Sequence, residues 1–301
     1  MINFENLLQL LEKLKTEQDC INYFVKVRWN GEVKCPFCFH NKVYSFQDKK
    51  RFKCKSCSQI FSYKTGTIFE NTKIPMRKWF LAIYIQASHK KGISSHQLAK
   101  DLGTTQKTAW FMLQRIRHIM ASNNNPFGGT TEIDEAYFGG KEENKHKHKK
   151  HTTTKQVVLG MVNRETGEVK AIKVASAEKS ILLPKIALNV KDGSVICTDT
   201  LHAYKDLSKH YKHHTIKHEA GEYVRKIEAF KVHTNAIEGY WSYVKRGIYG
   251  IYHWASKKHI QGYLNEFSFR YSKRALIDGA KFNELLLKTE SRLTYKQLIN
   301  A

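Results

Sequence analysis

Four cysteines in two closely spaced pairs constrain the fold of this chain more than any other feature of its sequence. Cys35 and Cys38 are followed, after 15 residues, by Cys54 and Cys57. This C-x2-C-x15-C-x2-C spacing is typical of a structural site in which four thiolates bind one Zn²⁺ ion. Because so small a module buries little core, bound zinc would supply folding free energy on the order of 10 kcal/mol. The sequence therefore predicts a zinc ribbon with a closed, structural Zn²⁺ site.

The balance of charge indicates a polyanionic partner. Lys and Arg total 51 against 27 Asp and Glu, which gives a formal net charge of +24. So many positive charges repel one another unless a polyanion neutralises them. Nucleic acid is such a polyanion, and its binding is favoured by the release of counterions from its phosphates. No stretch approaches the roughly 18 apolar residues of a membrane span, and the N-terminus lacks the apolar core of a signal peptide. We expect a soluble intracellular protein that binds nucleic acid.

Changes in composition and in the spacing of apolar residues divide the chain into five segments. The expected segments are an N-terminal helix (1–30), the zinc ribbon (31–70), a helical region (74–125), an α/β region (130–275) and a helical tail (276–301). The N-terminal helix is expected to be amphipathic because apolar residues recur at helical spacing. Its apolar face would hold Phe4, Leu7, Leu8, Leu11 and Leu14.

The helical region contains a helix-turn-helix pattern. A first helix would end at Gly103, and Thr104 or Thr105 would cap the second helix. The side chains expected to meet a DNA groove or its phosphates are Gln106, Lys107, Thr108 and Arg115. An ordinary helical hairpin has the same pattern, so DNA binding is favoured mainly by the neighbouring zinc ribbon and the basic charge.

Strands and helices alternate in residues 130–275. The expected order is three strands, a helix, a strand, a helix, a strand and then a helix. The first three strands can pair as an antiparallel meander, whereas the later strands are separated by crossovers and can add in parallel. The expected helices are Glu178–Asn189, Leu201–His210 and His233–Ile248. This pattern predicts an α/β fold.

Two aspartates stand at positions where an apolar strand would otherwise continue. Asp134 lies within the strand TEIDEAYFGG, and Asp199 ends the strand SVICTDT. A buried carboxylate without a partner is costly, and a divalent metal is one partner that removes the cost. Two such residues on adjacent strands would suit a pair of ions about 4 Å apart that serve phosphoryl transfer. The alternative is that each aspartate caps the turn or helix that follows it.

The segment VHTNAIEGYWSYVKRGIYG places more polar groups on one helical face. Glu238 and Lys245 are seven residues apart, so they share a face, and Asn235 lies nearly on the same face. On this face the carboxylate of Glu238 could bind a metal ion, and the ammonium group of Lys245 could bind a phosphate. Trp241 is expected to pack beneath this helix rather than to stack on DNA.

These motifs, taken together, resemble a known family. The residues that carry the resemblance are CPFC and CKSC, DEAYFGGK, TDTLHAY, and HTNAIEGYWSYVKRGIYGIYH followed by YLNEFSFRY. They span nearly the whole chain and are similar to the DDE transposases of bacterial insertion-sequence family 1595. The resemblance implies a ribonuclease-H-like catalytic domain, Mg²⁺ or Mn²⁺ as its cofactor, and recognition of the inverted-repeat ends of the element.

By this resemblance Asp134 and Asp199 match the two aspartates of the DDE site. The third ligand stays open between Glu238 and Asn235: the step to Lys245 favours Glu238, whereas the family varies at this position. The expected mechanism uses two metal ions to cut a phosphodiester at the end of the element, and the freed 3′-OH then attacks target DNA. Lys245 would steady a phosphate near the cut.

Double-stranded DNA is the expected partner, both as element ends and as target. Bringing two ends together requires a dimer or a higher oligomer, and the expected location is the bacterial cytoplasm, on the nucleoid. Two other functions fit the same residues. A nuclease or resolvase of this fold would cut without joining, and a transposase-derived regulator would bind DNA without catalysis. The ribbon and the helix-turn-helix favour transposition, and the intact acidic residues argue against the regulator.

Overall fold

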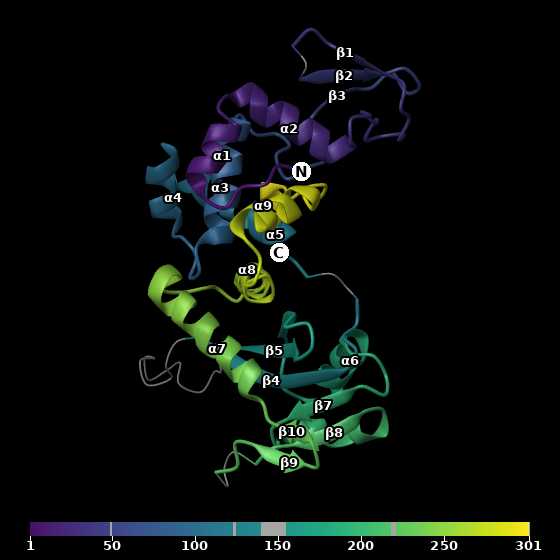
Figure 1. Cartoon of the computed structure of the whole chain (residues 1–301), viewed down its shortest axis with the longest axis vertical. Helices are drawn as coiled ribbons and strands as arrows, with labels where there is room; N and C mark the ends of the chain where they lie inside the picture. The colour runs from purple at the N-terminus through teal and green to yellow at the C-terminus, as the bar shows by residue number, and fades with distance from the viewer. Residues whose placement is uncertain (49, 123–124, 140–154, 218–220, 301) are drawn as a thin grey trace. The chain divides into compact units, whose positions relative to one another are not determined.

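The computed structural model describes residues 1–48, 50–122, 125–139, 155–217 and 221–300 (Figure 1). Its contacts divide the chain into two compact units. The first unit is Met1–Met120 with Ala275–Ala301, and the second is Ala121–Arg274. The C-terminal segment thus belongs to the same unit as the N-terminal helices. Within the described ranges, no helix is both long enough and apolar enough to cross a membrane.

Two short helices begin the first unit. They are α1 (Leu7–Lys13) and α2 (Glu17–Trp29). The helix is interrupted between them because Thr16 and Asp19 form a capping box that begins α2. Each of the two side chains accepts a hydrogen bond from the backbone N–H of the other residue, at 2.9–3.1 Å. The prediction of one continuous helix is wrong, and Leu8, expected on its apolar face, is 65% exposed.

The ribbon is an antiparallel sheet of three strands. In spatial order these are β1 (Val43–Ser45), β2 (Arg51–Cys54) and β3 (Ile60–Ser62). The rings of Phe52 and Phe61 stack with centroids 5.5 Å apart, and Trp29 at the end of α2 packs edge-on against both. This cluster of aromatic rings is small, as expected for a module that depends on a metal ion.

Five further helices complete the first unit. They are α3 (Met76–Ser88), α4 (Ser95–Leu102), α5 (Gln106–Ile119), α9 (Asp278–Leu287) and α10 (Tyr295–Asn300). Helix α9 packs against α2 and α3. The ring of Phe282 in α9 lies 5.4 Å from that of Phe4 and 5.3 Å from that of Phe80, between centroids. The C-terminal segment therefore helps to close the core of the N-terminal unit.

Helices α4 and α5 confirm the predicted helix–glycine–helix pattern. Gly103 ends α4 in the left-handed conformation with φ of 56°, which glycine adopts without strain. Thr105 caps α5, because its hydroxyl accepts a hydrogen bond from the N–H of Thr108 at 3.2 Å. Lys107 is exposed and Gln106 is half-buried. These side chains at the start of α5 remain accessible to a partner.

Arg115 of α5 contradicts its prediction as a DNA contact. The residue is only 4% exposed, and its guanidinium donates hydrogen bonds to the carbonyl oxygens of Ile68 and Glu70. The pattern along the helix could not show that the loop between the ribbon and α3 covers this face. Arg115 therefore stabilises the first unit and does not face solvent.

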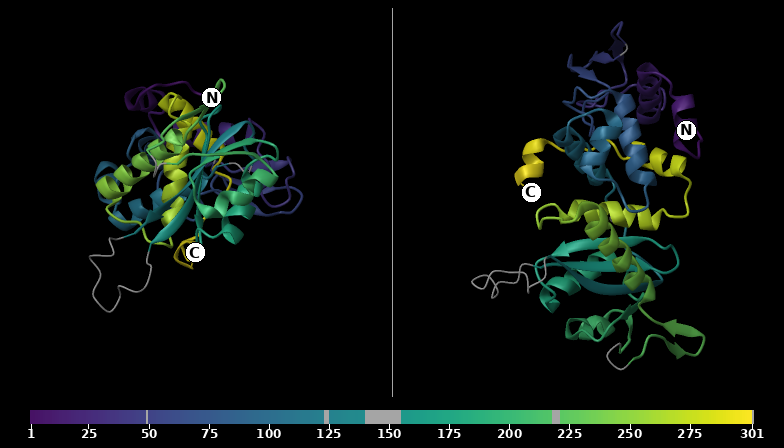
Figure 2. Two further views of the ribbon diagram at one scale, coloured as in Figure 1. Left: turned by 90° about the horizontal axis from the view of Figure 1, so that it is seen from below. Right: turned by 90° about the vertical axis from the view of Figure 1, so that its left-hand side faces the viewer.

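A five-stranded mixed sheet forms the centre of the second unit (Figure 2). Its strands are β4 (Thr130–Phe138), β5 (Gln156–Asn163), β6 (Val169–Val174), β7 (Val195–Thr198) and β8 (Lys212–Thr215), in the spatial order β6-β5-β4-β7-β8. Strands β4, β5 and β6 pair antiparallel, whereas β7 is parallel to β4 and β8 is parallel to β7. The predicted meander with later parallel additions is confirmed.

Helices cover both faces of this sheet. One face packs against α6 (Lys179–Asn189) and the 3₁₀ helix η3 (His202–Lys209), and the other packs against α7 (Asn235–Gly247) and α8 (Ile260–Ser272). Gly160 of β5 makes the close approach of α7 possible, because a Cβ atom there would clash with Trp241. Two elements were not predicted, the hairpin of β9 (Arg225–Ile227) with β10 (Phe230–Val232) and the π-helical turn η5 (Ile248–Tyr252).

Candidate active site

The four cysteines of the ribbon come together at one point. The Sγ atoms of Cys35 and Cys57 are 3.6 Å apart, those of Cys38 and Cys54 are 3.5 Å apart, and all four lie within 4.8 Å of one another. Four sulfurs at about 2.3 Å from a tetrahedral Zn²⁺ ion would be about 3.8 Å apart. The spacing therefore fits a structural zinc ion, with two ligands before β1 and two at and after the end of β2.

Asp134 and Asp199 meet because of the register between β4 and β7. Glu132 pairs with Cys197 in this parallel ladder, and each aspartate lies two residues further along its strand or just beyond it. The two side chains are therefore neighbours on one face of the sheet. Glu135 adds a third carboxylate, and one oxygen from each of the three residues lies within 4.8 Å of the others. Of the predicted residues, the structure brings these two aspartates together.

The electrostatics of this acidic cluster favour a bound cation. Burial, together with the negative charges of Glu135 and Asp199, raises the pKa of Asp134 to about 7. Burial also raises the pKa of Glu135, whose carboxylate accepts a hydrogen bond from the hydroxyl of Tyr204 at 2.7 Å. Such crowding of like charges in a half-buried place is typical of metal and catalytic sites.

Asp199 also caps the turn that follows it. One of its carboxylate oxygens accepts a hydrogen bond from the N–H of Leu201 at 3.1 Å. The helix η3 begins one residue later, and its N-cap is Leu201, not Asp199. The capping alternative therefore describes one contact of this carboxylate, and it does not explain why Glu135 and Asp134 lie beside it.

Helix α7 contacts the acidic cluster through its tryptophan. The indole N–H of Trp241 donates a hydrogen bond to the carboxylate of Asp134 at 3.0 Å. Glu238 precedes Trp241 by one turn and is exposed, and the hydroxyl of Thr234 donates to its carboxylate at 3.1 Å. Asn235 at the start of α7 and Lys245 one turn beyond Trp241 are also exposed. Among the described residues, the carboxylates whose oxygens lie within 4.8 Å of one another are those of Asp134, Glu135 and Asp199, and Glu238 does not belong to this group.

Glu132 in β4 links the sheet to the start of α7 by hydrogen bonds. Its carboxylate is fully buried and accepts hydrogen bonds from the N–H groups of Ala236 and Ile237, at 2.8 and 3.1 Å, in the first turn of α7. Arg164 donates to the same carboxylate at 2.7 Å, and Nδ1 of His233 lies 3.0 Å from it. A carboxylate at a helix N-terminus is favourable because unpaired N–H groups point toward it. Strand β4 and helix α7 are thereby fixed to each other beside the acidic cluster.

Replacing Glu132 by alanine is expected to destabilise the protein by about 3 to 5 kcal/mol, because it leaves Arg164 and two backbone N–H groups without their acceptor. Glu132→Gln keeps an acceptor oxygen and should lose less. Denaturant unfolding measures the effect. Glu168→Ala removes an exposed carboxylate from the turn before β6 and should change stability by less than about 0.5 kcal/mol. Equal stability of Glu132→Ala and Glu168→Ala would refute the role given to Glu132.

Sequence reasoning missed both Glu132 and Glu135. A signal for them exists in TEIDEAYF, where strand alternation puts Glu132 on the same face as Asp134 and Glu135 on the opposite face. Three acidic residues in the central strand of a buried sheet each need a partner. The partners lie far along the chain, in α7 and η3, so the pattern alone could not name them.

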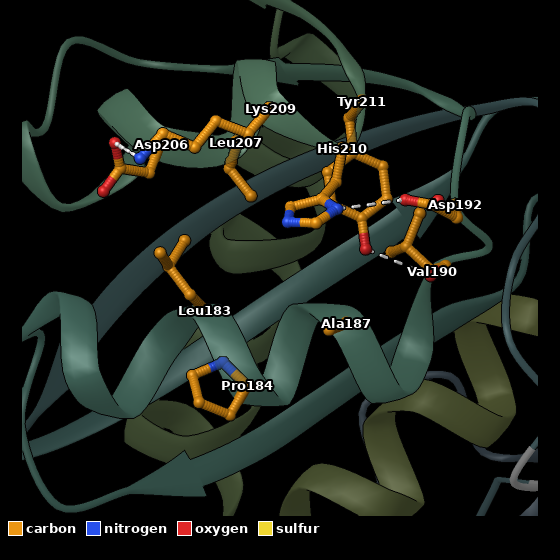
Figure 3. Close-up of a pocket in the computed structure, with 10 residues that line it drawn as sticks. All are labelled: Leu183, Pro184, Ala187, Val190, Asp192, Asp206, Leu207, Lys209, His210 and Tyr211. Atoms are coloured by element: carbon orange, nitrogen blue, oxygen red, sulfur yellow. Dashed lines mark hydrogen bonds and ion pairs between the residues drawn. The ribbon is translucent and has the colours of Figure 1, made fainter.

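A separate hollow of about 500 Å³ lies between α6 and η3 (Figure 3). Its lining is Leu183, Pro184, Ala187, Val190, Asp192, Asp206, Leu207, Lys209, His210 and Tyr211. Half of these side chains are aliphatic, and the charged ones pair with one another, as His210 does with Asp192 at 3.6 Å. The hollow contains none of the acidic cluster and lies on the face of the sheet opposite α7.

Two family models match this chain. Residues 126–272 match an ISXO2-like transposase domain of insertion-sequence family 1595, and residues 15–59 match a transposase zinc-ribbon domain. The chain is also 28% identical, over 273 residues, to an uncharacterized protein in the transposable element ISH50 of Halobacterium salinarum. That alignment covers 85% of this chain and 90% of the relative.

The mixed sheet with helices on both faces, and the carboxylates where β4 and β7 lie side by side, are features of a ribonuclease-H-like DDE domain. A four-cysteine ribbon precedes that domain. The chain belongs to the transposases of insertion-sequence family 1595. The predicted family and the predicted ribonuclease-H-like fold are confirmed.

Proposed function

We propose that this chain cuts DNA at the inverted-repeat ends of an insertion sequence and joins the freed ends to target DNA. The observation that carries the proposal is the meeting of Asp134 and Asp199 on adjacent parallel strands. Within the described part of the chain, neither aspartate pairs with a lysine, arginine or histidine. A cluster of carboxylates that lacks a protein cation is suited to divalent metal ions.

Asp134 and Asp199 would hold two Mg²⁺ or Mn²⁺ ions, which prefer oxygen ligands of this kind. When bound, such a pair of ions stabilises the attacking and leaving oxygens of an in-line displacement at phosphorus. Trp241 orients Asp134 through its hydrogen bond at 3.0 Å. Lys245 is exposed on the same helix and would hold a DNA phosphate beside the site.

Glu238 is our choice for the third metal ligand. It lies on the exposed side of α7, one turn from the tryptophan that touches Asp134. Glu135 is nearer to the two aspartates but is held by Tyr204 on the opposite face of the sheet. Asn235 is a neutral and weaker ligand. The Glu238 side chain would turn toward bound metal to complete the site.

This choice predicts unequal effects of single substitutions. Glu238→Gln should slow DNA cleavage by about 100-fold or more, because a charged metal ligand contributes several kcal/mol to the transition state. Asn235→Ala should stay within about tenfold of the wild-type rate. Initial cleavage rates in Mg²⁺ measure both. A larger loss in Asn235→Ala than in Glu238→Gln would assign the third ligand to Asn235.

The other modules of the chain support DNA as the partner. The zinc ribbon and the exposed start of α5 would contact element ends, and the net charge of +24 favours a polyanion. Joining two ends would require a dimer or a higher oligomer. We place this activity in the bacterial cytoplasm, on nucleoid DNA.

A direct test uses a plasmid that carries the flanking end sequences of the element. The purified full chain, supplied with Mg²⁺ or Mn²⁺, should introduce cuts that map to those ends. Cuts without any joining to a second plasmid would favour a nuclease of the same fold. Tight binding to the ends, with no cutting in either metal, would refute the enzyme and favour a transposase-derived regulator.

Metal affinity should depend on pH because the pKa of Asp134 is raised to about 7. A proton and a metal ion compete for this carboxylate, so a higher pH favours the metal. Below about pH 7 the apparent affinity should fall about tenfold per pH unit, and above about pH 8 it should level off. Titration calorimetry with Mn²⁺ near pH 6 and near pH 8 measures this. Equal affinities at the two pH values would show that Asp134 does not bind the metal.

A further inference from the structure

Two exposed aromatic rings follow the helix that carries Glu238. Tyr249 in η5 is 53% exposed, and Trp254, two residues after the end of η5, is 66% exposed. Within the described ranges, neither ring makes a hydrogen bond or a contact with another ring. Tyr252 between them is held inward, because its hydroxyl donates to Glu266 and its ring packs 4.7 Å from that of Tyr263. The segment is therefore anchored by one ring while the other two face solvent.

An exposed stripe leads along α7 from Glu238 to these rings. Glu238, Ser242, Lys245 and Tyr249 are spaced by four, three and four residues, and all four are exposed. This spacing puts them on one side of a helix, over about 16 Å of its length. The opposite side of the helix packs into the core of the unit through Ile237, Tyr240, Trp241, Val244 and Ile248. The stripe thus connects the proposed third metal ligand to Tyr249.

The sequence segment that carries the rings contains charges of one sign only. Residues 239–265 contain no Asp or Glu, and they contain the cations Lys245, Arg246, Lys257 and Lys258. Within the described ranges, none of these four side chains forms an ion pair. Cations that lack an acidic neighbour in their own protein are suited to the phosphates of a nucleic acid.

We propose that Tyr249, Trp254 and these four cations, here called the aromatic-basic surface, bind single-stranded DNA next to the acidic cluster. The inference rests on the proposed function only in taking DNA as the substrate. In a duplex the faces of the bases are covered by their neighbours, so an exposed ring can stack only on an unpaired base. Aromatic rings interleaved with cations form the usual platform for a single strand, with stacking for the bases and cations for the backbone.

The DNA bound by the aromatic-basic surface would be a strand that has been opened near the cut. A cleaved element end with a few unpaired nucleotides would place a base on Trp254 or Tyr249 and its phosphates along the stripe. The reacting strand would then be held on the same helix that carries Glu238. Duplex DNA without unpaired bases would contact the cations and leave the rings unused.

Binding of a labelled 12-nucleotide oligothymidylate to the full chain, without added divalent metal, tests the surface. Trp254→Ala should weaken binding about 5- to 100-fold, because one base–ring stack is lost, and should leave the salt dependence unchanged. Trp254→Phe retains a ring and should recover most of the affinity. Lys257→Ala should lower the slope of log affinity against log salt by about 0.7. Leu188→Ala, which shortens a side chain that is 68% exposed on α6, is the matched control and should change nothing.

A 2-aminopurine base in the oligonucleotide reports stacking directly. Its fluorescence should be quenched by the wild type and by Trp254→Phe, and less by Trp254→Ala. Unchanged affinity and quenching in Trp254→Ala would overturn the proposal. So would a change from dimer to monomer in Trp254→Ala with unchanged strand binding, because the rings would then form a protein interface. A chain that binds the strand through Trp254 yet never cuts DNA would refute the proposed function and leave this inference standing.

Discussion

Asp199→Asn is expected to abolish DNA cutting while the protein stays folded and still binds DNA. Asparagine keeps the shape of the side chain and the oxygen that accepts the N–H of Leu201 at 3.1 Å. It loses the negative charge that attracts a divalent cation. A loss of about 4 kcal/mol of transition-state stabilisation corresponds to about a 10³-fold slower reaction. Initial rates of cutting at an element end, measured in Mg²⁺, give the effect.

Stability provides a second readout for the same variant. Asp199 is one of the charges that raise the pKa of Asp134, so removing it relieves repulsion in the metal-free protein. The thermal midpoint of Asp199→Asn without metal should therefore equal or exceed that of the wild type. Asp192→Asn makes the same chemical change at a side chain that is 79% exposed, and it should cut DNA at the wild-type rate. Normal cutting by Asp199→Asn would contradict the role given to this carboxylate.

Removing a zinc ligand is expected to unfold the ribbon. Cys35→Ser replaces one of four sulfurs that lie within 4.8 Å of one another, and the side chain is fully buried. Structural zinc contributes on the order of 10 kcal/mol to small modules of this kind, far more than the stacked rings of Phe52 and Phe61 can replace. Metal analysis should show loss of zinc, and hydrogen exchange should show loss of protection in β1, β2 and β3.

Cys20→Ala is the matched control for this experiment. Cys20 is also fully buried, but it lies in α2 and is not part of the four-cysteine group. The control should keep one zinc ion per chain and a protected ribbon. Full zinc content and normal protection in Cys35→Ser would mean that Cys35 is not a ligand. The sheet of the second unit has its own core and should keep its protection in both variants.

Features that depend on local pattern were predictable from the sequence. The cysteine spacing predicts the ribbon because two Cys-x-x-Cys turns are enough to define the ligands. The apolar runs of β5 and β7 and the turn before β6 predict the order of the sheet. Asp134 and Asp199 could be named as candidate metal ligands from their places in two strands. The register of β4 with β7, which puts the two aspartates side by side, is known only from the structure.

Features that depend on distant partners were not predictable. Glu132 is a buried acid whose partners are Arg164, 32 residues away, and the start of α7, more than 100 residues away. Arg115 has the spacing of an exposed helix position, and only the loop around Ile68 and Glu70 shows that it is buried. The break at Thr16 is a different case, because its two reciprocal hydrogen bonds with Asp19 are local and interrupt an otherwise continuous apolar pattern. For Glu132 and Arg115, contacts with residues far along the chain determine the surroundings of the side chain, and the local sequence does not show these contacts.

Joining of a pre-cleaved DNA end in a single chemical step tests most directly whether this chain catalyses strand transfer. A labelled, pre-cleaved element end with a 3′-OH is incubated with the full chain, a target plasmid and Mg²⁺, and is compared with the same end carrying a 3′-deoxy terminus. We expect joined products from the 3′-OH end only, and none from either end with Asp199→Asn. Joining of the 3′-deoxy end, or no joining by the wild type in Mg²⁺ or Mn²⁺, would contradict this expectation.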